Sequence, residues 1–198
     1  MPIRMDKIKT STQNRKVGEN TLVLNMTSAK DCPSRRLGLC KHPDRCYARK
    51  AEIFRTDPIK SCLKSRRKNA IIWNKLNALE ISNQLLRKIQ APNRKHKIKF
   101  LRFSESGDFR TQYDVNKMNR IAEYLKISKV KVYGYTARRD LDFSSLSDNI
   151  TVNGSGFMLH NQFNAVEKIT SKNSCVGNCR ICNKCKYTRG KIVQVKYH

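Results

Sequence analysis

The stretches KIKFLRF (97–103), QYDVNKMNRIAEYLKI (112–127) and KVKVYGY (129–135) decide the predicted fold. The first and third have the alternating apolar residues of β-strands, and the second has apolar residues at helical spacing, among them Val115, Met118 and Ile121. A strand, a helix and a second strand in this order form a right-handed unit with parallel strands. The sequence therefore predicts an α/β protein with a parallel sheet or a partial (β/α) barrel.

Other segments extend this prediction in both directions. Further strands are expected at 21–26, 149–153 and 191–197, the last at an edge of the sheet. Helices are expected at 43–54 and at 65–90, where Pro92 follows the second one. Residues 1–19 are polar and basic and are expected to form an irregular arm. Residues 20–198 are then one α/β domain, which includes a metal-binding segment at 174–187.

The segment SCVGNCRICNKCK (174–186) places Cys175, Cys179, Cys182 and Cys185 in a C-x3-C-x2-C-x2-C array. Thiolates select zinc, copper(I) or iron–sulfur clusters. Four-cysteine zinc sites usually consist of two C-x2-C pairs that a longer loop separates, whereas consecutive short steps wrap one segment around a cluster. This spacing favours a [4Fe–4S] cluster over zinc, and disulfides or free thiols are the third interpretation.

Four further cysteines lie in the N-terminal third, at irregular spacing. Cys32, Cys40 and Cys46 are candidates for further metal ligands, because loop sulfurs need only to converge in space. Cys62 follows them after a longer interval. Buried structural thiols are the alternative interpretation of all four.

The chain carries 42 Lys and Arg against 15 Asp and Glu, a formal net charge of +27. Such an excess favours a polyanionic partner, and nucleic acid is expected to bind through its phosphates. A solvated cationic surface without a partner is the alternative. Nothing in the pattern identifies the contact residues or an oligomeric state.

The sequence also indicates a compartment. No apolar run approaches the roughly 20 residues that span a bilayer, and the first twenty residues lack the apolar core of a signal peptide. We therefore expect a cytoplasmic protein without a membrane partner. Thiols there are mostly reduced, so eight cysteines favour metal over disulfides.

Ligands of parallel α/β proteins bind beyond the carboxyl ends of the strands. The loops after the expected strands at 97–103 and 129–135 therefore form the candidate binding rim. Its residues are Glu105, Ser106, Gly107, Asp108, Arg138 and Arg139. These residue types are also common in loops without a function. No known catalytic motif is present, so the catalytic residues, if any, are not assigned.

Several pieces together resemble a known family: DCPS (31–34), RCYARKA (45–51), FLRFSESGDF (100–109), VYGYTA (132–137) and the C-terminal cysteine array. In wording and order they resemble the bacteriophage "gene product 88" family, from about residue 20 to residue 187. Membership implies a phage or prophage origin, and hence the cytoplasm of the host cell. It implies no defined activity.

A more distant resemblance is to the radical S-adenosylmethionine enzymes. Cys175, Cys179 and Cys182 are similar to their C-x3-C-x2-C motif, and Ser106-Gly107-Asp108 is similar to the turn that holds the methionine amino group. The resemblance implies a partial barrel and S-adenosylmethionine as a cofactor. In those enzymes the motif lies near the first strand, and Cys185 here offers a fourth thiolate.

Three hypotheses follow from these patterns. The first is a phage iron–sulfur protein that contacts nucleic acid. The second is a radical S-adenosylmethionine-like or other redox enzyme. The third is a zinc-stabilised nucleic-acid-binding module.

Overall fold

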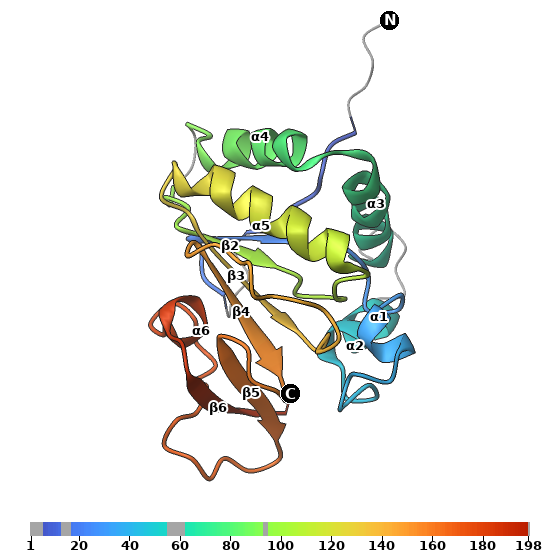
Figure 1. Cartoon of the computed structure of the whole chain (residues 1–198), viewed down its shortest axis with the longest axis vertical. Coiled ribbons are helices and arrows are strands. Elements are labelled where there is room, and N and C mark those ends of the chain that lie inside the picture. The colour runs from blue at the N-terminus through green and yellow to red at the C-terminus, as the bar shows by residue number, and fades with distance from the viewer. Residues whose placement is uncertain (1–5, 13–16, 55–61, 93–94, 198) are drawn as a thin grey trace, which may run out of the picture.

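A single six-stranded sheet organises the computed structural model, which describes residues 6–12, 17–54, 62–92 and 95–197. Every strand pairs in parallel with the next one in the sequence, so the spatial order is β1-β2-β3-β4-β5-β6 (Figure 1). The predicted parallel α/β fold is confirmed, with the strand order of a partial barrel. The strands are β1 Thr21–Leu24, β2 Phe100–Phe103, β3 Lys131–Thr136, β4 Ile150–Ser155, β5 Asn161–Val166 and β6 Lys191–Lys196.

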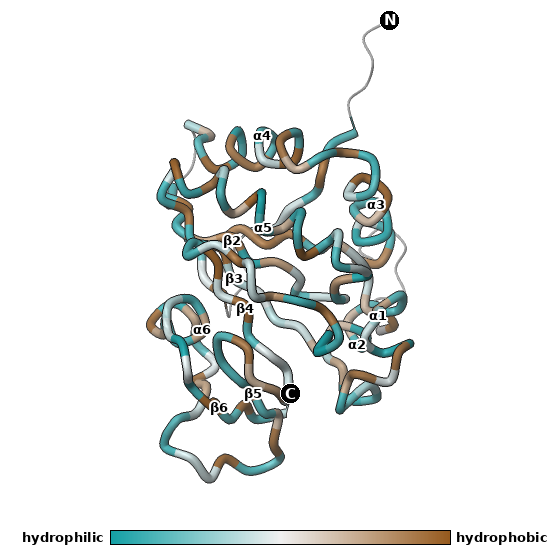
Figure 2. Tube along the Cα trace, in the orientation of Figure 1, coloured by the Kyte–Doolittle hydropathy of each residue, from teal (hydrophilic) through white to brown (hydrophobic). Residues whose placement is uncertain are grey.

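Helices cover one side of the sheet, which we call the helix face. They are α3 Cys62–Lys75, α4 Ala78–Ile89 and α5 Gln112–Lys126 (Figure 1). Leu101 and Phe103 of β2 point toward them and pack with Trp73, Ile81 and other apolar side chains in one buried cluster. In Figure 2 brown and teal alternate along these helices, as expected when one stripe of each faces a core. Burial of this stripe is the main source of stability on this side.

Two helix predictions need correction. The expected helix at 65–90 is two helices, because Asn77 ends the run and caps α4: its side chain accepts from the Glu80 amide, and the Glu80 side chain accepts from the Asn77 amide. The expected helix at 43–54 begins later, as α2 Tyr47–Phe54. A short helix, α1 Pro33–Arg36, precedes it and was not expected.

Strand β5 was also missed by the sequence reasoning. Its sequence NQFNAV is mostly polar, and no helix separates it from β4, as a parallel pair ordinarily requires. The strands are staggered, so that Asn153 pairs with Asn161 and residues 156–160 suffice as a connection. Gly154 makes this turn possible, because a Cβ there would lie 2.1 Å from the Phe157 carbonyl oxygen.

The opposite side of the sheet, which we call the cysteine face, is covered by the C-terminal segment. The short helix α6 Lys184–Tyr187 packs on β3 and β4. A second, smaller buried cluster lies here, with Phe100, Tyr133, Phe163, Cys185 and Val193. The predicted edge strand at 191–197 is confirmed as β6.

The expected N-terminal arm contributes to the body of the protein. Ser11 pairs with Val23 of β1 in an antiparallel bridge, and Ile8 is buried in the helix-face cluster. No helix among the described residues is both long and apolar enough to cross a membrane.

Candidate metal centre

The four C-terminal cysteines line a single small cavity on the cysteine face. Its walls include Cys175, Cys179, Cys182 and Cys185, together with Tyr135 and other side chains of the sheet. None of the eight cysteines of the chain, all within the described residues, forms a disulfide. The array predicted from spacing is therefore brought together in space.

Buried asparagines of the sheet hold the segment that carries Cys185. The Asn153 side-chain amide donates to the carbonyl oxygens of Gly134 and Cys185, both at 3.0 Å. Asn161 donates to Asn153 at 2.9 Å and to the Thr188 carbonyl oxygen at 2.7 Å. Both side chains are fully buried. These polar side chains of β4 and β5 thus hydrogen-bond to the backbone of α6 and of the residue that follows it. This explains why the positions are not apolar.

The other cysteines are positioned from two further directions. The Cys175 amide donates to the Gln194 carbonyl oxygen of β6 at 2.8 Å. Lys186, which is 1 % exposed, donates from Nζ to the Cys179 carbonyl oxygen at 2.8 Å and lies 4.2 Å from the centre of the Phe100 ring. The array is therefore tied to β6 and to the sheet through backbone groups.

The thiols of this cavity are electrostatically coupled. Cys179 hydrogen-bonds to Cys185, and this contact together with burial raises the pKa of the Cys185 thiol far above its ordinary value. Two adjacent thiolates repel each other in a site of low polarity. A bound cation removes that repulsion, so metal binding and deprotonation of these thiols are expected to occur together.

The size of the cavity bears on which metal fits. Its volume is about 20 Å³, and no three His, Cys, Asp or Glu side chains of the described residues converge tightly enough to hold an ion as packed. The donor set nevertheless fits a thiophilic metal, because four cysteines line one space.

The N-terminal cysteines form a second group, in the segment that follows β1. Cys40 lies within electrostatic range of Cys32 and Cys46, and Cys32 and Cys40 lie within range of Asp108. Burial raises the pKa of Cys32 to about 12 and raises that of Cys40. Cys62, in the first turn of α3, is separate from this group. Its sulfur lies 3.9 Å from the Ala51 carbonyl oxygen. Of the three candidates named from the sequence, Cys40 is thus near each of the other two, but no three metal-ligating side chains of the described residues converge there.

The predicted rim after β2 is at that same edge, but much of it is engaged internally. Asp108 accepts hydrogen bonds from Ser34, Thr136 and the Ala137 amide at 2.6 to 2.8 Å, and so joins the segments that follow β1, β2 and β3. Gly107 adopts a φ of +73°, and a Cβ there would lie 2.2 Å from Thr27 Cγ2. These two residues build the edge rather than face solvent.

The remaining rim residues divide in the same way. Arg138 is buried, pairs with Asp140 at 2.8 Å and donates to the Arg110 carbonyl oxygen at 2.9 Å. Arg139 is exposed, and Glu105 is half-buried with its carbonyl oxygen bonded to the Tyr47 hydroxyl. The structure therefore brings the rim residues together at one edge, where Glu105 and Arg139 remain the more accessible ones.

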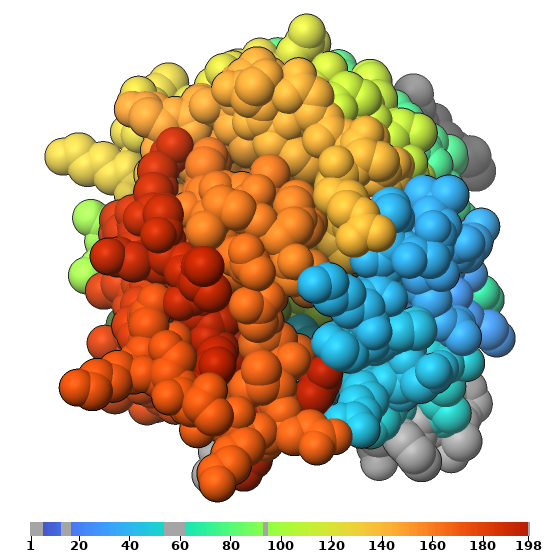
Figure 3. All heavy atoms as spheres, turned by 60° about the horizontal axis from the view of Figure 1, so that its bottom comes forward, coloured from blue at the N-terminus to red at the C-terminus, as the bar shows by residue number. Residues whose placement is uncertain are grey.

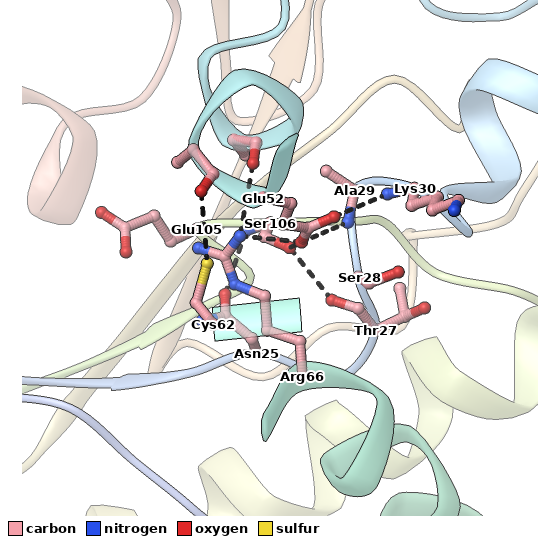
Figure 4. Close-up of polar contacts among 12 residues, drawn as sticks. Asn25, Thr27, Ser28, Ala29, Lys30, Glu52, Cys62, Arg66, Glu105 and Ser106 are labelled. Carbon is pink, nitrogen blue, oxygen red and sulfur yellow. Dashed lines mark hydrogen bonds and ion pairs between the residues drawn. The ribbon is translucent and has the colours of Figure 1, made fainter. Parts of the chain in front are cut away.

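Sequence reasoning missed Glu52, which stabilises this edge. Its carboxylate accepts from the amides of Ala29 and Lys30, both at 2.9 Å, from Arg66 at 2.8 Å and from Ser106 at 3.1 Å (Figure 4). Glu52 is 5 % exposed. The sequence signal for Glu52 was its position in the expected helix, six residues after Cys46. It fixes α2, and hence the cysteine segment before it, against β1 and β2.

Comparison with known proteins gives one match. A protein-family model described as "Gene product 88" matches residues 3–178. No curated protein and no solved structure matches the chain.

Proposed function

The chain belongs to the gene product 88 family, and we propose that it is an iron–sulfur protein of that family. The observation that carries the proposal is the cavity lined by Cys175, Cys179, Cys182 and Cys185. Short steps between consecutive cysteines suit a [4Fe–4S] cluster better than tetrahedral zinc. With four thiolates the cluster has no open iron, which suits electron transfer, sensing or a structural role.

Nucleic acid is the proposed partner. The excess of 27 positive charges remains after every carboxylate is counted, so ion pairs such as Arg66–Glu52 and Arg67–Asp31 leave it unbalanced. A groove of about 570 Å³ between α1 and α3 is lined by Arg36, Arg67, Arg110 and Asp31. Arg67 pairs with Asp31 and Arg110 with Asp114, so a phosphate backbone in this groove would compete with these carboxylates. Binding of DNA or RNA that weakens steeply with salt is expected, and no binding at low salt would sink this part.

A second candidate, a radical S-adenosylmethionine-like enzyme, is favoured by the position of Cys32, Cys40 and Cys46. They follow β1 at the carboxyl edge of a sheet with partial-barrel order, where such enzymes carry their motif. Three thiolates would leave one iron of a cluster open to a cofactor. Their C-x7-C-x5-C spacing differs from the C-x3-C-x2-C motif of those enzymes, so this candidate assigns only the cluster to the N-terminal cysteines. The C-terminal array then becomes an additional, closed site.

The experiment that tests the first proposal is anaerobic purification followed by a visible spectrum and analysis of iron, sulfide and zinc. Brown protein with iron and sulfide supports it, and colourless protein with stoichiometric zinc replaces it with the zinc-stabilised binding module.

The enzyme candidate has a separate test. The reduced protein should cleave S-adenosylmethionine, and Cys46→Ala should abolish cleavage while iron at the C-terminal array persists. Cleavage that depends on Cys182 and not on Cys46 would contradict the assignment, because Cys182 belongs to the other group.

A further inference from the structure

Between the two cysteine groups lies a positive charge that is in no ion pair with a described carboxylate, although Glu105 lies within its electrostatic range. Arg102 is the central residue of β2 on the cysteine face, and its register partner on β3 is Tyr133. No carboxylate of the described residues forms an ion pair with its guanidinium. Its Nε is buried and has no hydrogen-bond partner among the described residues. A charge removed from water without a counter-ion is costly, so this arrangement calls for an explanation.

The surroundings of the guanidinium hold it in place without neutralising it. Nη2 donates to the Tyr47 hydroxyl at 3.3 Å, and that hydroxyl donates to the Glu105 carbonyl oxygen at 2.8 Å. Cζ lies 5.4 Å from the centre of the Tyr135 ring. These contacts orient the planar fork, and a pre-oriented fork is the geometry that binds carboxylates and phosphates with two parallel hydrogen bonds.

Two neighbouring hydroxyls also lack partners. The Ser104 Oγ is buried and makes no hydrogen bond with the described residues, and Ser104 adopts a φ of +52°, which is strained for a residue other than glycine. The Tyr133 hydroxyl is buried near Thr21 but makes no hydrogen bond of normal geometry. Three buried polar atoms, on β2, directly after β2 and on β3, thus have no hydrogen-bond partner among the described residues.

Ser104 and Tyr133 are 7 % and 1 % exposed and Arg102 is half-buried, so a ligand would reach this site past the segments that surround it. Figure 3 shows a hollow between the blue segment that follows β1 and the orange segment of β4 and β5. Tyr47, which holds the guanidinium, comes from the blue side directly after Cys46, and Lys41 of the same side lies against Gly156 at the end of β4. Arg102 thus lies between the wall that carries the N-terminal cysteines and the sheet that carries the C-terminal ones.

We propose that Arg102 anchors an oxyanion-binding site on the cysteine face, which receives the carboxylate or phosphate group of a small ligand. Ser104 and Tyr133 line the site with hydroxyls, and Tyr47 keeps the guanidinium oriented. The inference goes beyond the proposed function and does not depend on which metal the cysteines hold. The main alternative is that Arg102 serves as the counter-ion of a thiolate-bound metal at the C-terminal array, since Cys185 lies within its electrostatic range.

The test is calorimetric titration of the full-length protein, as purified anaerobically, with sodium phosphate and separately with sodium acetate at constant ionic strength. We expect saturable binding of one of the two anions at one site, with phosphate indicating a nucleotide-like ligand and acetate a carboxylic acid. Arg102→Gln should weaken binding at least about tenfold, because the fork is lost. Arg120→Gln removes one exposed charge from α5 and should leave binding unchanged, which controls for the high net charge.

If Arg102→Gln does not fold, Arg102→Lys replaces it in the test. Lysine keeps the positive charge and removes only the paired donors of the guanidinium, and it should also weaken anion binding. Three outcomes would overturn the proposal. One is the absence of saturable binding by either anion, and another is equal binding by the parent and the Arg102 variants. The third is loss of metal from Arg102→Gln with unchanged anion affinity, which would make Arg102 the counter-ion of the metal site.

Discussion

The two faces of the sheet are built from opposite kinds of residue. On the helix face, β2 presents Leu101 and Phe103 to a continuous apolar core. On the cysteine face, the same strand presents Phe100 and Arg102, and the neighbouring strands present tyrosines and asparagines. One face is stabilised by removing hydrocarbon from water, and the other by a connected set of hydrogen bonds around a group of thiols.

The difference teaches where stability and function separate. The helix face needs nothing that the chain does not supply, because its buried side chains fill their own space. The cysteine face has polar atoms and sulfurs whose bonding the chain leaves incomplete. Perturbing each face should therefore give different signatures, and the predictions below run from the largest expected effect to the smallest.

Removing a ligand of the proposed metal centre should have the largest effect. Cys179→Ala should abolish metal at the C-terminal array and remove the stabilisation that depends on it, because binding free energy of a structural metal is folding free energy. Metal analysis and thermal unfolding measure this. Cys62→Ala, at a cysteine outside both groups, is the matched control and should retain the metal. Full metal content in Cys179→Ala would refute the site.

A cavity on the helix face should destabilise without touching the metal. Leu101→Ala in the centre of β2 should lower the free energy of unfolding by about 3 kcal/mol, since a fully buried leucine is replaced by a void. Urea denaturation measures the loss, and metal per chain should stay at the parent value. Leu79→Ala, at a half-exposed position of α4, is the control with little effect. Metal loss in the folded Leu101→Ala protein would show that the faces are not independent.

Removing a polar support of the cysteine face should affect both quantities. Asn153→Ala removes the donor to the Cys185 carbonyl oxygen and one of the two acceptors of the Asn161 side-chain amide, at a cost of about 2 kcal/mol. Because α6 is then held less firmly, metal should also be lost faster to a chelator. Asn116→Ala, on the exposed side of α5, is the control. If the chelation rates of both variants match that of the parent, the asparagines do not position the centre.

The smallest effect concerns acid. Burial and the charges of Arg189 and Lys131 lower the pKa of His160 to about 4, and its Nδ1 accepts from the Val152 amide at 3.0 Å. Folding thus favours the neutral imidazole. The contribution of His160 to the free energy of unfolding is therefore complete above about pH 6.5 and is lost as the pH falls toward 4. With allowance for partial solvent exposure, the loss is about 1 kcal/mol.

His160→Asn keeps an acceptor for the Val152 amide and removes the titration. Unfolding free energies measured between pH 7 and pH 4 should fall less steeply in the variant than in the parent. If the free energy of unfolding falls equally steeply in the variant and the parent, other groups cause the loss of stability in acid.

The helix face was largely predictable from the sequence, whereas the cysteine face was not. Val115, Met118 and Ile121 follow the helical period because they face one core, so the pattern predicts α5 nearly to its ends. Strand β5 has no such pattern, because its asparagines bind the backbone of α6 rather than pack in an apolar layer. The break before α4 was readable in principle, since Asn77 and Glu80 form a capping box.

The candidate site was predictable only in its residue types. Spacing identified the C-terminal cysteines, because local sequence brings them together. The grouping of Cys32, Cys40 and Cys46 depends on Glu52 and Asp108, which join segments distant in sequence. Arg102 lies between the two cysteine groups because of the order of the strands in the sheet. No local sequence pattern indicates this position.

The strict succession of strands has a consequence for biosynthesis. Each strand of the sheet pairs with the one made just before it, so the sheet is able to grow in the order in which the ribosome delivers the chain. The segment of the N-terminal cysteines, however, touches a residue that follows β6: the Tyr197 hydroxyl bonds the His42 ring at 2.9 Å, and Arg45 lies over the Tyr197 ring. The segment after β1 therefore gains these contacts only after all six strands have been synthesised.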